Sequence, residues 1–140
     1  MRKNKSLMYL LVVAVVVFIA GCSTSVKRDS LEVEKALIGH WVNTGATLDY
    51  YFSDTALIKV EKGGSTTNMT YTIVETNKTE NTITIQVNNP ASGTGTILDE
   101  DTKVIKFSAD RKTMTETVNV LGVKISEVNF SYVDSKTSPK

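Results

Sequence analysis

Very few side chains in this 140-residue sequence could carry out chemistry. The chain has one cysteine, Cys22, and one histidine, His40. A Ser-His-Asp triad cannot be assembled around a single histidine at the entry to the folded domain, and no Gly-x-Ser-x-Gly motif occurs. No His/Cys/Asp cluster has metal-ligand spacing, and the acidic run 99–101 lacks the ligand spacing of a calcium loop. We therefore predict a protein that is not an enzyme and that holds no cofactor or metal.

The thiol of Cys22 has the most informative surroundings. It follows the small residues Ala20 and Gly21, and these end an apolar run that begins at Leu7. Basic residues between positions 2 and 5 precede that run. This order of basic, apolar and small residues is typical of a secretory signal. The run is shorter than the roughly 20 residues that a stable membrane-spanning helix needs.

The segment Ile19-Ala20-Gly21-Cys22 resembles the lipobox of bacterial lipoproteins. The resemblance implies that residues 1–21 are a signal peptide, that cleavage falls between Gly21 and Cys22, and that the sulfur receives a diacylglyceryl group. Further acylation, for example with palmitate, would follow at the new amine. Two or more acyl chains anchor a protein where one does not, because each buried methylene contributes about 0.8 kcal/mol. An ordinary secretory signal with an incidental cysteine is the alternative.

Lipidation would place the protein on the extracytoplasmic face of the cell membrane, or on the outer membrane of a host that has one. Loss of the three basic residues in the signal reduces the 16 basic residues to 13 against 15 acidic ones, a net charge of −2. No basic stripe interleaved with aromatic residues occurs, so we expect no nucleic-acid partner. The mature chain is the size of one domain, and we expect a monomer.

Composition and periodicity divide the mature chain into three parts. Residues 22–28 are the lipidated cysteine and a polar tether, residues 29–133 form the domain, and residues 134–140 form a flexible tail. Asp29-Ser30-Leu31-Glu32 has the form of a capping box, which predicts a short helix over residues 30–37 that ends before Gly39.

From position 40 to 133, apolar and polar residues alternate with the period of half-buried strands. The expected inward-facing residues are Leu48, Tyr50 and Phe52; Ile58 and Val60; Met69, Tyr71 and Ile73; Ile83, Ile85 and Val87; Ile105 and Phe107; and Met114, Val118 and Val120. In the last strand the alternation slips, which predicts a β-bulge near Ser126–Glu127. The connections are short, so neighbouring strands are antiparallel. We therefore predict an all-β fold, a small up-and-down barrel preceded by a short helix, because closure hides the strand edges.

A short helix, then Gly39-His40-Trp41, then an antiparallel meander resembles the lipocalin-like (calycin) group, and more closely the small, slim lipocalin-like lipoproteins of bacteria. The resemblance implies that Trp41 covers the barrel floor, that Gly39 packs closely beside it, and that a ligand binds inside. Two family features are missing. No Thr-Asp-Tyr turn stands at the expected place, and no late arginine is available to cover the tryptophan, since the last one is Arg111. Trp41 as a plain core residue is the alternative.

Two carboxylates share the inward face in this pattern. Glu116 alternates with Met114, and Glu75 alternates with Tyr71. A buried carboxylate is costly unless it is paired or hydrogen-bonded. Either both groups reach water at the barrel rim, or they line a polar pocket with Tyr50 and Tyr71 nearby. The second interpretation predicts a pocket for a small, mainly apolar ligand.

The segment 91–96 offers a different function. It contains Ser92, Gly93, Thr94 and Gly95 and resembles the Ser/Gly-rich loop of membrane-anchored lysozyme inhibitors. The cysteines of those proteins, and the aromatic or basic residue after the loop, are absent here. The alternative to a small ligand is therefore an envelope protein as the partner, bound through this loop. A flexible connection is the simpler interpretation.

Overall fold

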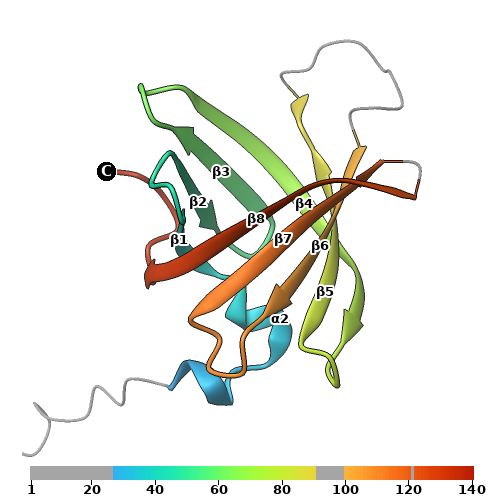
Figure 1. Cartoon of the computed structure of the whole chain (residues 1–140). Coiled ribbons are helices and arrows are strands. Elements are labelled where there is room, and N and C mark those ends of the chain that lie inside the picture. The colour runs from blue at the N-terminus through green and yellow to red at the C-terminus, as the bar shows by residue number, and fades with distance from the viewer. Residues whose placement is uncertain (1–26, 91–99, 121) are drawn as a thin grey trace, which may run out of the picture.

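The computed structural model describes residues 27–90, 100–120 and 122–140. Within these ranges the chain forms eight antiparallel strands that close into a barrel in sequence order (Figure 1). The strands are β1 (Gly39–Asn43), β2 (Leu48–Phe52), β3 (Ala56–Glu61), β4 (Thr66–Asn77), β5 (Thr82–Asn88), β6 (Glu100–Phe107), β7 (Thr113–Val120) and β8 (Val123–Asp134). The predicted all-β, up-and-down barrel is thereby confirmed.

Pairing of the first and last strands closes the barrel. Trp41 lies opposite Tyr132, and Asn43 lies opposite Phe130. Because every strand has a neighbour on both sides, the barrel has no unpaired edge that could recruit another chain. The pairing extends to Asp134 at the end of β8, so the barrel includes the first residue of the expected tail.

The two ends of the barrel differ. At one end, here called the floor, two helical turns lie beneath the strands together with the β4–β5 and β6–β7 connections (Figure 1). The other end, here called the mouth, carries the β1–β2 and β3–β4 turns. The helical turns are η1 (Arg28–Ser30) and α2 (Val33–Ala36).

These two turns replace the single helix expected over residues 30–37. Neither begins with a side-chain cap, so the predicted capping box is wrong. Asp29 lies inside η1, and Glu32 is the N-cap of α2. The carboxylate of Glu32 pairs instead with the Lys78 ammonium across the floor, at 2.6 Å. The Glu32 carboxylate, which a capping box would use, is therefore engaged in a tertiary ion pair instead.

Apolar side chains fill the floor half of the barrel. Trp41, Phe52 and Leu57 are completely buried, and Phe130 is nearly so. The rings pack at the edge-on and stacked geometries that aromatic pairs favour, such as Tyr50 stacked on Phe130 at 4.7 Å between centroids. The other members of the core are Val33, Ala36, Leu37, Tyr71, Ile83, Ile85, Val87, Ile105, Phe107 and Met114. A barrel of eight strands is narrow enough for its own side chains to fill it at this level.

Strand β3 faces the opposite way from the prediction. Leu57 lies opposite Phe52 and is completely buried, whereas Ile58 and Val60 are only half-buried on the outer side. Lys59 therefore points to the interior, directly opposite Tyr50. The apolar alternation failed here because the inward side of this strand opens to water at the mouth, where charged residues are tolerated.

Three bulges in the described strands change which residues face inward. Between β8 and β1, Val133 is the extra residue and lies exposed, since Trp41 pairs with Tyr132 and His40 with Asp134. In β4 the register shifts between Ile73 and Glu75, so Val74 is an extra residue and lies exposed. On the side of β8 that pairs with β7, the extra residue is Ile125, since Val118 pairs with Ser126 and Asn119 with Lys124. The slip expected near Ser126–Glu127 is therefore a bulge one residue earlier. The bulge in β4 left no trace in the alternation.

Candidate binding site at the barrel mouth

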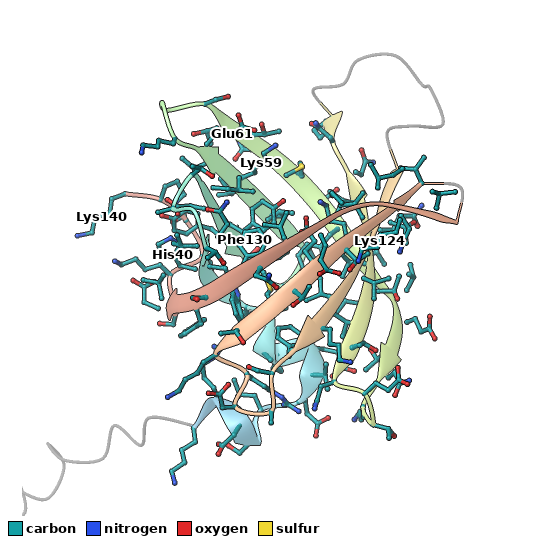
Figure 2. The ribbon with its side chains drawn as sticks, viewed as in Figure 1. His40, Lys59, Glu61, Lys124, Phe130 and Lys140 are labelled. Carbon is teal, nitrogen blue, oxygen red and sulfur yellow. The ribbon has the colours of Figure 1, made fainter. Side chains whose placement is uncertain are left out.

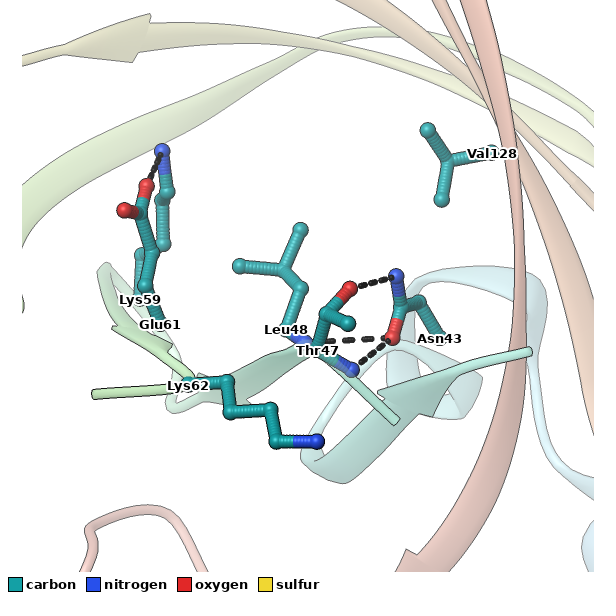
Figure 3. A pocket seen from close by; sticks show the side chains of 7 residues that line it. All are labelled: Asn43, Thr47, Leu48, Lys59, Glu61, Lys62 and Val128. Atoms are coloured by element: carbon teal, nitrogen blue, oxygen red, sulfur yellow. Dashed lines mark hydrogen bonds and ion pairs between the residues drawn. The ribbon is translucent and has the colours of Figure 1, made fainter. Parts of the chain in front are cut away.

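A hollow of about 500 Å³ opens at the mouth of the barrel. Its apolar part consists of Leu48 from β2 and Val128 from β8, which approach it from different sides (Figure 3). Its remaining lining is polar or charged. These residues are Asn43, Thr47, Lys59, Glu61 and Lys62. A lining of this mixture suits a small molecule with both an apolar and a polar part.

Hydrogen bonds fix the rim of this hollow. The Oδ1 atom of Asn43 accepts from the backbone N–H groups of Thr47 and Leu48, at 2.8 and 3.1 Å. Its Nδ2 atom donates to the Thr47 hydroxyl at 3.0 Å. On strand β3, the Lys59 ammonium pairs with the Glu61 carboxylate at 2.7 Å (Figures 2 and 3). The rim is thus held in place by its own polar groups before any ligand is bound.

A buried polar cluster of Tyr50, Lys103 and Glu116 adjoins the hollow. Glu116 lies directly opposite the lining residue Val128, and Tyr50 lies opposite Lys59. The Lys103 ammonium donates to Glu116 Oε1 at 3.0 Å, and the Tyr50 hydroxyl approaches the same oxygen at 3.4 Å. Glu116 is only 3% exposed and Lys103 only 8%.

The second carboxylate oxygen of Glu116 is the unusual atom of this cluster. Oε2 is buried and has no hydrogen-bond partner within the part of the chain that the structure describes. A buried polar atom without a partner costs free energy, because it has given up its bonds to water. Glu116 does point inward, as the alternation predicted, and the interpretation that it reaches water at the rim is wrong.

The structure brings together only two of the four predicted pocket residues. Tyr50 and Glu116 meet, but Glu75 is exposed on the outer face, because the extra residue Val74 turns it outward opposite Thr84. Tyr71 is buried at the other end of the barrel, where its hydroxyl donates to the backbone oxygen of Ser53. Burial, with a smaller contribution from the charge of Asp54, raises the pKa of Tyr71 to about 12. A smaller hollow of about 240 Å³ also borders Tyr71.

Lys103 completes the polar cluster and was absent from the predicted site. A signal for it exists in the sequence: Lys103 alternates with Ile105 and Phe107, which do face the core. The same alternation that identified Glu116 therefore applies to Lys103. A lysine is rarely buried unless it is paired. The position of Lys103 therefore becomes informative only once Glu116 is placed within its reach on the neighbouring strand β7.

At the floor, Trp41 is completely buried and its indole N–H donates to the backbone oxygen of Leu37 at 2.8 Å. Gly39 sits where no larger residue fits. Its φ is +129°, and an added Cβ would lie 2.7 Å from both the backbone oxygen of Asp134 and a ring carbon of Tyr132. Gly39 and Trp41 thus both lie at the floor of the barrel.

An arginine covers these floor aromatics, and it comes from the tether rather than from the end of the chain. The guanidinium carbon of Arg28 lies 3.4 Å from the ring centroid of Tyr132 and 5.1 Å from that of Trp41. Its Nε atom donates to the backbone oxygen of Arg111 at 2.8 Å, and its Nη2 atom donates to that of Ala36. Burial lowers the pKa of Arg28 below its usual value. No feature of the sequence around Arg28 indicated this role.

The remaining predicted residues lie elsewhere. His40 is on the outer face, stacked on Tyr51 at 4.2 Å and 3.8 Å from carboxylate oxygens of Asp49 and Asp134. No group of three potential metal ligands occurs in the described ranges. Gly21, Cys22 and the loop residues Ser92, Gly93, Thr94 and Gly95 are outside the described residues.

Comparison with protein-family models, with curated proteins and with solved structures found no match for this chain. None of the helices between residue 27 and the C-terminus that the structure describes has the length and apolar character needed to cross a membrane.

Proposed function

We propose that this protein is a lipid-anchored, non-catalytic binding protein of the cell envelope, and that its binding site is the mouth of the barrel. The lipobox-like segment that ends at Cys22 supports the anchor and the location. The hollow beside the buried polar cluster supports the binding role. The Lys103 ammonium is held in an ion pair with Glu116, and an ammonium is not a nucleophile, so we propose binding rather than catalysis for this site.

The single observation that carries this proposal is the buried Glu116 Oε2 atom without a partner among the described residues. Glu116 pairs with Val128, which lines the hollow of about 500 Å³. A ligand that donates a hydrogen bond to this oxygen would satisfy it and would bury its apolar part against Leu48 and Val128. An alcohol, amide or amine has such a donor. A carboxylate has none, and it would bring a second negative charge next to Glu116. We therefore narrow the small apolar ligand of the sequence prediction to an amphipathic one with a donor group.

A pair of probes of equal length tests the ligand class. We expect 1-octanol to shift the NMR signals of the Leu48 and Val128 methyl groups in a saturable way, and octanoate to leave them unchanged. The double substitution Lys103→Met with Glu116→Leu removes both charges while keeping the interior filled. It is expected to abolish the response to octanol.

The matched control is Lys106→Met, which removes an exposed lysine on the outer face of the same strand, β6. It should bind octanol as the unmodified chain does. Octanol binding that survives the double substitution, or equal binding of octanoate, would contradict the proposed site. The anchor is tested separately by metabolic labelling with a fatty-acid probe, which should mark the chain and fail to mark Cys22→Ser.

A further inference from the structure

Arg28 fixes the point at which the tether leaves the barrel. Its guanidinium lies over the rings of Tyr132 and Trp41, and it donates to backbone oxygens of the β6–β7 connection and of α2. These contacts join four separate parts of the chain at one side chain. Whatever precedes residue 28 must therefore start from the floor, at the end of the barrel opposite the binding site.

The length of chain between the anchor and this contact is short. Six residue steps separate Cys22 from Arg28, and they span at most about 20 Å in any conformation. The longest wall of the barrel is much taller. Strand β4 has 12 residues, which corresponds to about 40 Å along the strand and about 30 Å along the barrel axis at the usual tilt. The tether is thus too short to run from the floor past the mouth.

We propose that the floor of the barrel faces the bilayer and that the mouth faces away from it, into the aqueous envelope. This inference rests on the proposed lipid anchor at Cys22. The partner of the floor is the lipid surface that holds the acyl chains of that residue. It follows that the ligand reaches the mouth from the aqueous phase and not directly from the leaflet in which the protein is anchored.

Charge on the floor does not provide this orientation. Lysines and carboxylates are mixed there, and two of the lysines pair with carboxylates, Lys35 with Asp54 at 3.8 Å and Lys78 with Glu32 at 2.6 Å. Arg28 is directed into the protein, so it is not available to lipid headgroups. A surface of mixed sign gains little from an anionic membrane. The orientation should therefore be the same on vesicles of neutral phosphatidylcholine and on vesicles that contain anionic phosphatidylglycerol.

Two fluorescent labels distinguish the ends of the barrel on the lipidated chain in vesicles. One is attached at Glu80→Cys in the exposed β4–β5 connection at the floor, and the other at Ser65→Cys in the exposed β3–β4 turn at the mouth. Cys22 is acylated and does not react. With nitroxide-labelled lipids present, we expect quenching of the floor label to be several-fold stronger than quenching of the mouth label, in both kinds of vesicle.

Lengthening the tether provides the decisive variant, because it leaves the barrel and Arg28 untouched. An insertion of about twenty Gly and Ser residues before Lys27 extends the reach beyond the barrel height, and the difference between the two labels should be lost. Arg28→Ala should reduce the difference as well, because it adds residues 28–32 to the tether. Equal quenching of both labels with the original tether, or a difference that the insertion leaves unchanged, would overturn the inference while the anchor stands. Failure of the chain to bind vesicles would overturn the anchor and the inference with it.

Discussion

Lys103 and Glu116 place two opposite, buried charges in the barrel interior, next to the apolar core. Removing one partner of a buried pair leaves the other charge uncompensated, which typically costs about 3–5 kcal/mol. We expect Lys103→Met to lower the free energy of unfolding by about this amount. The double substitution Lys103→Met with Glu116→Leu should restore most of the loss, because replacing both charges by apolar groups is often close to neutral. Urea unfolding of the two single variants and the double variant measures the coupling, and purely additive losses would disprove it.

Tyr71 gives the folded chain a dependence on alkaline pH. Its pKa is raised to about 12 in the folded state, against about 10 for an ordinary tyrosine. The folded state therefore favours the neutral phenol, so this stabilisation is complete below about pH 10 and is lost as the pH rises toward 12. The loss is on the order of 2 kcal/mol.

Urea unfolding at pH 8.5 and at pH 11.5 tests this expectation. Tyr71→Phe should be less sensitive to the change than the unmodified chain, because the phenol that titrates has been removed. The pKa of Tyr51 is also raised by burial, but that group is present in both proteins and cancels in the difference. An identical loss of stability in the two proteins would show that Tyr71 contributes nothing to the alkaline response.

At the level of elements, the contact between β1 and β8 at Gly39 has no room for a side chain. We expect Gly39→Ala to cost at least about 2 kcal/mol, because the positive φ is strained for alanine and the added methyl collides with the backbone of Asp134. Gly45→Ala is the matched control. A Cβ there has only ordinary contacts, the nearest at 3.7 Å, and the change should stay within about 0.5 kcal/mol. Thermal unfolding of both variants tests this expectation. Equal unfolding midpoints would contradict the close approach of Asp134 and Tyr132 to Gly39.

Some elements could be predicted from the alternation of residues and others could not. In β5, Ile83, Ile85 and Val87 all face a dry interior, so the apolar side of the strand and its inner side coincide. In β3 the apolar side and the inner side do not coincide. Lys59 and Glu61 line the water-filled mouth, while Ile58 lies on the outer face. Alternation identifies the core only where the interior excludes water.

The bulge in β4 shows a second limit. It reverses the direction of Glu75, yet Val74 and its neighbours read as an uninterrupted strand. By contrast, the bulge at Ile125 was visible, because the apolar residues on either side of it have different parity. An extra residue can be found in a sequence only when the residues after it keep a clear pattern. The same limit explains why Glu116 was placed correctly and Glu75 was not. Glu116 lies in a regular stretch of strand, whereas Glu75 follows a bulge.

At the level of the whole molecule, the last strand completes the barrel. Ending the chain after Lys136 removes only exposed residues beyond β8 and should change the free energy of unfolding by less than about 0.5 kcal/mol. Ending the chain after Val128 removes Phe130 and Tyr132, and it removes the part of β8 that pairs with β1. We expect that shorter chain to lose its barrel and to aggregate through open strand edges. Circular dichroism and size-exclusion chromatography compare the two, and a monomeric, folded short chain would contradict this expectation.

The overall architecture could be predicted from the sequence. Short connections make neighbouring strands antiparallel, and closure into a barrel hides the strand edges. The arginine over Trp41 did not follow, because contacts between residues far apart in sequence leave no local pattern. Arg28 reaches Arg111 across 83 positions, and only the closed barrel brings the two together. The burial of Trp41 at the floor could therefore be predicted from the sequence, and the contact of Arg28 with it could not.

The ring of strands is joined by the pairing of β1 with β8, so the native fold can form only after residues 123–134 have been synthesised. A ribosome-bound fragment that ends before β8 has two open edges and an exposed tryptophan. Contacts between such distant segments also form slowly, because a long loop must first be ordered. A chain whose barrel closes this late stays unfolded during most of its synthesis, as the proposed export across a membrane would require.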